Sequence, residues 1–243
     1  MNDITKVRPV NTAPDTKTLV RHAGPPLGIV ATIFVVLFNA GLLPVTAFGG
    51  SSYFPGPGES INVISAFFRA RPSAVLLCAA LQFGAAIPLG IFTATVVSRL
   101  RFLGLRAAGT DIALFGGFAT AINMMASSSV LWTMSYPGIA QEPALLQALY
   151  RLTFALGGPG FSVPLGLLIA GVSITAGFSK LLPKWIVILG IMLAVIGELS
   201  WLDILFPRAL PLIPLTRFPG FVWMIAAGFS LPKTIDRAKV EQK

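Results

Sequence analysis

Charged residues are scarce in this chain: Asp, Glu, Lys and Arg together make up only 11% of its 243 residues. Soluble domains typically carry about a quarter charged residues. Hydrophobic residues account for 55% of the total, and they lie in several runs long enough to cross a bilayer. The composition therefore excludes an ordinary soluble protein and predicts a polytopic membrane protein.

Cysteine and histidine are each present once, as Cys78 and His22. No disulfide can form within the chain, and a Cys/His zinc site or a His-ligated haem would need more ligands than the sequence holds. Nucleophilic catalysis has equally little support, because the serines at 127–129 have no histidine to act as a base. The sequence also lacks an HExxH motif and a phosphate-binding glycine loop. We therefore predict a non-catalytic protein without a metal or a cofactor.

Basic residues exceed acidic ones, which gives a net charge of +9. No stripe of basic residues with interleaved aromatic residues is present, so we predict no nucleic-acid partner. The positive-inside rule explains the excess, because most lysines and arginines fall in segments that a cytoplasmic N-terminus would place inside. The lipid bilayer is then the principal partner, and both termini are predicted to be cytoplasmic (N-in/C-in).

Six apolar runs predict an all-α bundle of six transmembrane helices. Polar segments at 1–24 and 232–243 are predicted to be cytoplasmic tails around a transmembrane domain of residues 25–231, and the first tail is predicted to be disordered. The spans are expected at residues 26–48, 73–97, 110–135, 146–178, 184–205 and 210–229.

A short helix is predicted after the first span. Ile61, Ile64, Phe67 and Phe68 recur there at helical spacing, and Pro72 follows them. The pattern suits a helix that lies in the membrane interface. An ordinary helix in an extramembrane loop is the alternative.

A local similarity links the second and fourth spans. Residues 87–94 read IPLGIFTA and residues 163–170 read VPLGLLIA, and each segment precedes a basic turn and another span. In a chain this rich in Ala, Leu, Gly and Pro, coincidence is the favoured explanation. A parallel duplication of a helical hairpin, as in some transporters, is the alternative.

Glu198 is an ionisable residue within the fifth span. A carboxylate in a membrane span costs roughly 2.5–3.5 kcal/mol on insertion scales, so it needs a partner or a wet cavity. At about 1.5 Å of rise per helical residue, Glu198, Arg217 and Arg151 all fall in the outer leaflet. We therefore predict that Glu198 pairs with Arg217 or Arg151 at a pocket that opens outward. The alternative is a charge pair that only fixes helix packing.

The fourth span is interrupted near mid-membrane by the sequence GGPG at 157–160. Non-helical backbone at that depth must be buried in protein or line a water-filled cavity, and helix breaks of this kind form substrate sites in some transporters. Polar residues of other spans are expected at a similar depth. The candidate ligand-binding residues are Glu198, Arg217, Arg151, Asn39, Gln82, Asn123, Gly158 and Gly160.

The segment from residue 166 to 197, GLLIAGVSITAGFSKLLPKWIVILGIMLAVIG, holds an apolar helix, a basic turn with Leu-Pro-Lys-Trp and a second apolar helix. Together with the later FVWMIAAGFSLPK, it resembles uncharacterised bacterial multi-pass inner-membrane proteins of domain-of-unknown-function type. The resemblance covers roughly the C-terminal third of the chain. It implies a bacterial cytoplasmic-membrane location, and it implies no activity and no functional residues.

Two function classes remain open on the sequence. One is a module that binds or transports a small polar or amphipathic molecule at the outward-facing pocket. The other is a structural or regulatory subunit that packs against a membrane-protein partner or a second copy. Binding predicts that the candidate residues converge on one cavity, whereas a subunit predicts dispersed or tightly paired residues and a broad face of small residues turned to lipid.

Overall fold

The computed structural model describes residues 19–46 and 53–236. Within these residues, six helical segments are long and apolar enough to cross a membrane, which confirms the six spans expected from the sequence. The segments are Leu27–Val45, Pro72–Phe102, Ala108–Met134, Pro143–Phe178, Lys184–Ile204 and Pro207–Ser230.

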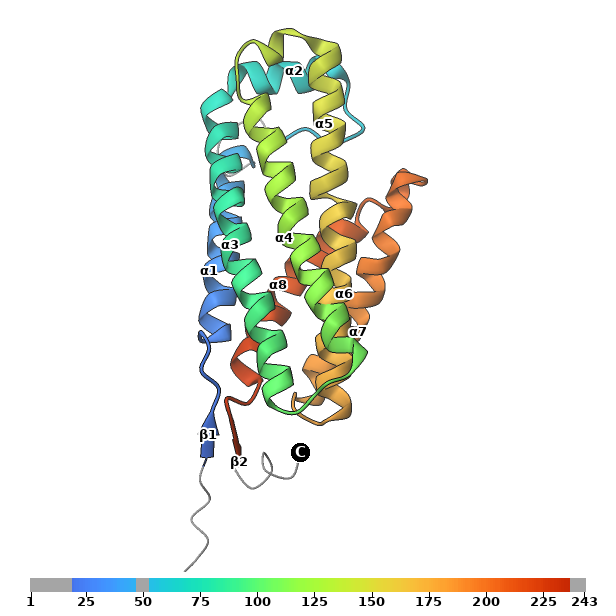
Figure 1. Cartoon of the computed structure of the whole chain (residues 1–243). Coiled ribbons are helices and arrows are strands. Elements are labelled where there is room, and N and C mark those ends of the chain that lie inside the picture. The colour runs from blue at the N-terminus through green and yellow to red at the C-terminus, as the bar shows by residue number, and fades with distance from the viewer. Residues whose placement is uncertain (1–18, 47–52, 237–243) are drawn as a thin grey trace, which may run out of the picture.

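Some spans consist of a single helix, and others combine two helical pieces (Figure 1). The second and third spans are α3 (Pro72–Phe102) and α4 (Ala108–Met134). The first is α1 (Leu27–Leu42) with η1 (Leu43–Val45), and the fourth is α5 (Pro143–Gly157) with α6 (Pro159–Phe178). The fifth is α7 (Lys184–Leu199) with η4 (Ser200–Ile204), and the sixth is η5 (Pro207–Ala209) with α8 (Leu212–Ser230). The short helices outside the spans are α2 (Ile61–Ala70) and η3 (Ile139–Gln141).

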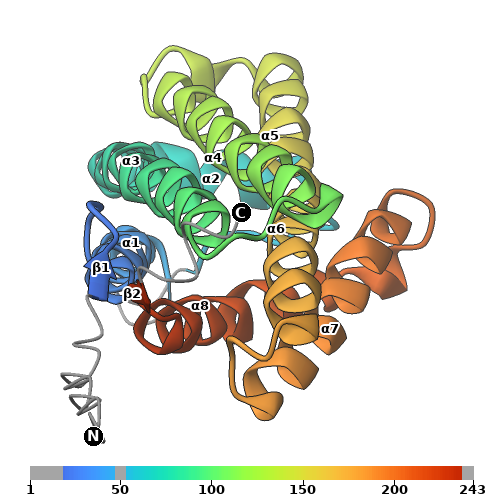
Figure 2. The same cartoon turned by 60° about the horizontal axis from the view of Figure 1, so that its bottom comes forward.

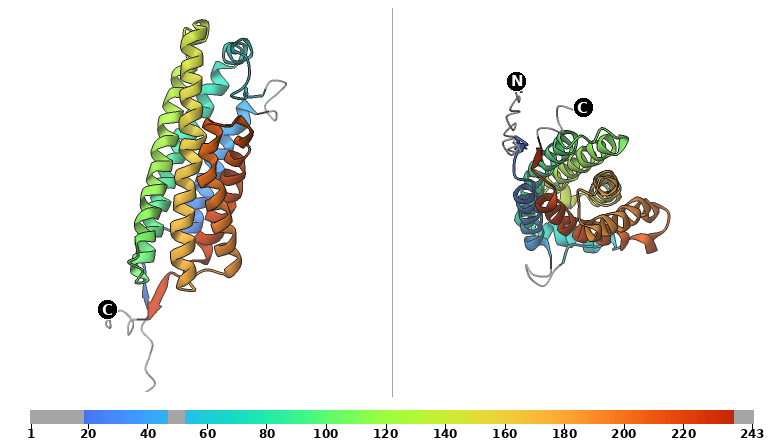
Figure 3. Two further views of the ribbon diagram at one scale, coloured as in Figure 1. Left: turned by 90° about the vertical axis from the view of Figure 1, so that its right-hand side faces the viewer. Right: turned by 90° about the horizontal axis from the view of Figure 1, so that it is seen from below.

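The spans form a closed ring of neighbouring helices. Each helix contacts the next in the order α1, α3, α4, α6, α7 and α8, and α8 contacts α1 to close the ring. Helix α8 lies between α1 and α7 and also touches α6 across the ring, as the turned view shows (Figure 2). The view from below shows the helices roughly end-on (Figure 3). A side chain that points inward from any of these spans can therefore meet side chains from several others.

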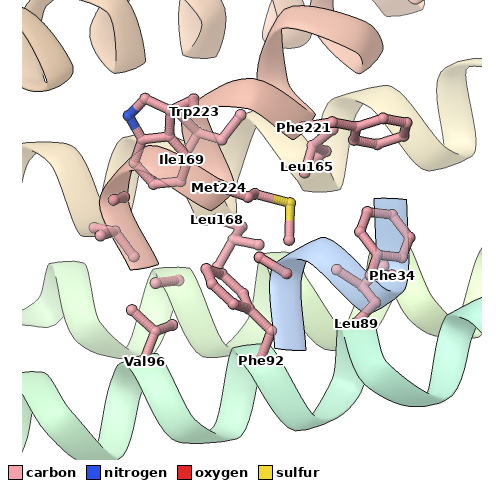
Figure 4. Close-up of a cluster of buried hydrophobic side chains, with 14 of the residues drawn as sticks. Phe34, Leu89, Phe92, Val96, Leu165, Leu168, Ile169, Phe221, Trp223 and Met224 are labelled. Atoms are coloured by element: carbon pink, nitrogen blue, oxygen red, sulfur yellow. The ribbon is translucent and has the colours of Figure 1, made fainter. Parts of the chain in front are cut away.

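Two hydrophobic clusters divide the interior along the helix axes. The larger joins buried side chains of α1, α3, α6 and α8, among them Phe34, Phe92, Phe221 and Trp223 (Figure 4). The smaller lies at the end where α2 crosses the bundle, and it joins α2, the start of α3, the end of α4 and α5. Close helix packing supports the larger cluster: a Cβ added at Gly228 would lie 2.8 Å from the backbone nitrogen of Gly28. Such contacts stabilise helix pairs in lipid, where apolar burial alone gives little driving force.

The two polar ends of the described chain meet at the opposite end of the bundle. Strand β1 (Leu19–Arg21) pairs antiparallel with β2 (Thr234–Asp236), with Val20 opposite Ile235. Residues 19–21, which belong to the tail predicted to be disordered, thus form a strand. The physical reason is that α1 begins beside the end of α8 (Figure 1), so the adjoining backbones can satisfy each other's hydrogen bonds. The rest of the predicted tails, 1–18 and 237–243, lies outside the described residues.

The segment between β1 and α1 is fastened to the end of α3. The His22 ring nitrogen Nε2 lies 3.0 Å from the Ser98 hydroxyl, and Arg99 donates a hydrogen bond to the Pro25 carbonyl at 3.3 Å. Burial lowers the pKa of His22, and the positive charge of Arg99 lowers it further. These contacts hold the terminal strands against the bundle.

The turns that follow α3 and α6 are built alike. Gly104 follows α3 with a φ of 87°, and Lys180 follows α6 with a φ of 54°. In both turns the next residue's N–H bonds a carbonyl in the last helical turn, which is the Schellman pattern of helix ends. The similarity noticed between the second and fourth spans thus extends beyond its sequence letters.

The two hairpins, α3–α4 and α6–α7, also share one spacing. Each hairpin has a proline inside its first helix. The separations in sequence from this proline to the helix end, to the residue with positive φ and to the start of the next helix are the same in both hairpins. These positions are Pro88, Phe102, Gly104 and Ala108 in one hairpin, and Pro164, Phe178, Lys180 and Lys184 in the other. The common spacing favours a duplicated hairpin over coincidence.

Candidate functional site

A cavity of about 270 Å³ lies inside the ring, on the side of the smaller hydrophobic cluster. Its walls come from the end of α1, the segment at 54–57, α3, α4, α5 and the start of α8. Most lining side chains are apolar, such as Leu42, Phe54 and Leu131. The polar lining groups come from Gln82, Ser127, Thr153, Tyr150, Thr46 and Arg217.

Among the described residues that line the cavity, Arg217 of α8 supplies the only formal charge. Its Nη2 donates a hydrogen bond to the carbonyl of Gly157, at the end of α5. The guanidinium carbon lies 4.8 Å from the ring centre of Phe161 and 5.6 Å from that of Phe38. Its Nε is buried and has no hydrogen-bond partner among the described residues. A cation at a helix C-terminus and over aromatic faces is favourably placed, but its donors are not all used.

The break between α5 and α6 forms the part of the wall that Arg217 touches. Gly158, with φ −88° and ψ −102°, separates the two helices, and Pro159 begins α6. Proline suits the first position of a helix, because its missing N–H costs no intrahelical bond there. A Cβ at Gly158 would lie 2.6 Å from the Phe154 carbonyl oxygen, so the chain can bend this closely only with glycine. The predicted interruption of the fourth span is confirmed.

Asn123 of α4 satisfies a backbone carbonyl that a proline leaves without its usual donor. The Gly160 carbonyl would normally accept the N–H four residues ahead, but Pro164 stands at that position and has none. The Asn123 side-chain amide donates to this carbonyl at 2.6 Å instead. One turn away, the Ser127 hydroxyl donates to the Thr153 carbonyl of α5 at 2.9 Å. Helix α4 therefore supports the broken span with polar side chains on both sides of the break.

Glu198 does not pair with either arginine. Neither Arg217 nor Arg151 has a carboxylate oxygen of a described residue within 4.0 Å, so the predicted charge pair is wrong. The Glu198 carboxyl instead packs against α6, where its Oε1 would lie 3.0 Å from a Cβ added at Gly166. That oxygen is buried, and no described residue forms a hydrogen bond with it.

The geometry of α8 explains why the pair does not form. Thr216 contacts α7 at Gly197, so this side of α8 faces the helix that carries Glu198. Arg217 is the next residue, and successive residues of a helix point about 100° apart, since 3.6 residues make a turn. Arg217 therefore turns away from α7 and toward the cavity, although the two charged residues lie on adjacent helices.

The remaining candidates divide between the cavity and other places. Gln82 and Gly158 line the cavity together with Arg217. Asn39 donates a hydrogen bond back to the Val35 carbonyl of its own helix at 2.7 Å and is not a lining residue. Arg151 is exposed and is not a lining residue. Gly160 contributes the carbonyl that Asn123 binds. The cavity thus gathers three of the eight candidates, with Asn123 and Gly160 next to its wall.

Sequence reasoning missed the aromatic side chains of the site. Phe38 and Phe161 enclose the Arg217 guanidinium, and Tyr150 lines the cavity and donates its hydroxyl proton to the Pro55 carbonyl. The Tyr150 ring also stacks on Phe54, with ring centres 5.9 Å apart. Phenylalanines occur in every span except the fifth, so only their contacts with Arg217 distinguish these two from packing residues.

In the described part of the chain, no group of three or more His, Cys, Asp or Glu side chains could hold a metal ion. Comparison with known proteins adds no assignment: no family model, no curated protein and no solved structure matches this chain. The resemblance to uncharacterised bacterial membrane proteins therefore stays a prediction. The cavity and its residues must carry any functional proposal.

Proposed function

We propose that this chain is a non-catalytic integral membrane protein that binds a small amphipathic molecule in the cavity inside its helix ring. One observation carries the proposal: an apolar cavity coincides with the broken span and with a cationic side chain. Ligand pockets are typically apolar with a few convergent polar groups, and this cavity has that character. Binding is the step that a receptor and a transporter share.

The membrane setting is part of the same proposal. We place the chain in a bacterial cytoplasmic membrane with both termini inside, as the excess of basic residues at those segments favours. The pairing of β1 with β2 supports termini on one side. Six spans agree with it, because an even number of crossings returns the chain to the side where it began. Helix α2 would then lie at the outer interface. A cysteine placed at Glu142 in a Cys78→Ser background should react with an impermeant reagent from outside, and one at Lys180 should not; the opposite labelling would reverse the orientation.

Direct binding tests the cavity. The full chain in phosphatidylcholine nanodiscs is dialysed against radiolabelled octanol, an uncharged amphiphile, with empty nanodiscs as the background. Leu131, which is buried and lines the cavity, is replaced by Trp to fill the space. We expect the Leu131→Trp variant to lower octanol affinity by at least about tenfold, a loss of roughly 1.4 kcal/mol.

Leu215 provides the matched control. It carries the same side chain on α8 but is 48% exposed and does not line the cavity. The Leu215→Trp variant should bind octanol like the wild type. Equal octanol binding by the wild type and the Leu131→Trp variant would contradict the proposal.

The alternative of a structural or regulatory subunit gains no specific observation. Large exposed apolar side chains are spread over all six spans, as lipid contact requires.

A further inference from the structure

The guanidinium of Arg217 is an unneutralised charge in the cavity wall. All other lining side chains are uncharged, and no carboxylate of a described residue lies within 4.0 Å of it. An arginine at such a depth is costly unless it has a partner. Two phenylalanine rings and one carbonyl compensate it in part.

The hydrogen-bond donors of Arg217 are also not all used. A guanidinium has five N–H donors in a planar fork, which matches a carboxylate or a phosphate. Arg217 donates from Nη2 to the Gly157 carbonyl, and within the part of the chain that the structure describes its buried Nε has no partner. The fork therefore retains donors, and the side chain that carries it lines the cavity.

The chain also contains a carboxylate that could have neutralised Arg217 but does not. Glu198 lies on the adjacent helix and packs its carboxyl against α6 at Gly166. The two charges thus remain separate, although each is poorly satisfied. The natural complement of Arg217 is then a group that comes from outside the chain.

We propose that the ligand is an amphiphile with an anionic head, a carboxylate or a phosphate monoester, which binds the Arg217 fork while its apolar part occupies the rest of the cavity. This inference rests on the proposed function and specifies the ligand class. The apolar walls from Leu42, Phe54 and Leu131 suit the hydrocarbon. A free hydrophilic anion would leave those walls without a contact.

Matched probes test the charge of the head. Octanoate, octyl phosphate and octanol share one hydrocarbon chain, and acetate and inorganic phosphate carry the head without it. Equilibrium dialysis with the nanodisc-embedded full chain should give the tightest binding for one or both of the anionic octyl compounds. Whichever of the two binds more tightly identifies a carboxylate or a phosphate source.

Variants of Arg217 test its role. Arg217→Gln should weaken binding of the anionic amphiphile by about ten- to hundred-fold, the range expected for a hydrogen bond to a charged group. Octanol binding should change less than about twofold, which also shows that the cavity remains intact. Arg217→Lys keeps the charge without the planar fork, so its affinity for the anionic amphiphile should lie between those of the wild type and Arg217→Gln.

Arg151→Gln is the control, because it removes the same charge from an exposed site on α5 and should bind like the wild type. If Arg217→Gln fails to fold, the Arg217→Lys variant carries the comparison. Equal affinity for octanol and both anionic octyl compounds would overturn the anionic head while leaving the proposed cavity standing. Competition by acetate or inorganic phosphate as strong as that of the octyl compounds would overturn the amphiphile. Absence of binding by every octyl probe would overturn the proposed function as well.

Discussion

The two similar hairpins differ where the cavity lies. Counted back from the shared proline, Gln82 of α3 and Gly158 of the fourth span occupy the same position, and both line the cavity. Gln82 lies inside a continuous helix, whereas Gly158 separates α5 from α6. The comparison teaches that one copy supplies an unbroken wall, and the other exposes backbone carbonyls that side chains must satisfy.

The broken copy is where the polar contacts gather. Three of its carbonyls accept hydrogen bonds from side chains of neighbouring helices. The donors are Arg217 to Gly157, Asn123 to Gly160 and Ser127 to Thr153. In lipid each unsatisfied carbonyl is costly, because water cannot replace the lost hydrogen bond. The break therefore fixes which neighbouring residues must be polar, and it brings the one lining cation to the cavity wall.

The largest expected effect comes from Gly158→Ala. The added Cβ would lie 2.6 Å from the Phe154 carbonyl oxygen, so the backbone must shift. We expect the free energy of unfolding to fall by roughly 2–4 kcal/mol. The equivalent change in the continuous copy, Gln82→Ala, should cost less than about 1 kcal/mol, because alanine suits a helix interior. Denaturation by SDS in mixed micelles measures both, and equal losses would contradict the assigned difference between the copies.

A smaller effect is expected at Asn123. Asn123→Ala leaves the Gly160 carbonyl without its 2.6 Å hydrogen bond, which should cost about 1–2 kcal/mol of unfolding free energy. Pro164→Ala restores an N–H at the position that normally bonds this carbonyl. The double variant should therefore lose less stability than the sum of the two single variants. Strict additivity in this double-mutant cycle would show that Asn123 does not substitute for the missing N–H.

Sequence reasoning succeeded where one local pattern decides the outcome. Apolar runs set the six spans, and the three glycines and one proline at 157–160 set the break. Arg217 was a candidate because an intramembrane arginine is costly without a function or a partner, and the structure places it in the cavity wall. The same reasoning could not give its partner, because the direction of a side chain depends on which face its helix turns to each neighbour. Arg217 and Glu198 lie at adjacent levels yet face different spaces.

Two other features needed the assembled chain. The pairing of β1 with β2 depends on the start of α1 lying beside the end of α8, which no local pattern in either tail reveals. Asn39 and Asn123 are the same residue type in apolar runs, but one bonds its own helix and the other bonds a neighbouring helix. Depth along a span can be counted from the sequence, whereas the facing neighbour cannot.

The smallest effect concerns the glycine two residues after each shared proline. At Gly90 the nearest atom to an added Cβ is 3.9 Å away, while at Gly166 the Cβ would meet the Glu198 carboxyl at 3.0 Å and the Ala194 carbonyl at 3.2 Å. The position equivalent to Glu198 in the first hairpin is Ile122, which is exposed and leaves that space open. Gly90→Ala should therefore raise the free energy of unfolding by roughly 0.5–1 kcal/mol, since alanine is the better helix former. Gly166→Ala should lower it by about 1 kcal/mol, because the α6–α7 contact is too close for a methyl group. Shifts of the same sign in SDS denaturation would show that the two glycines do not differ in the way their neighbours suggest.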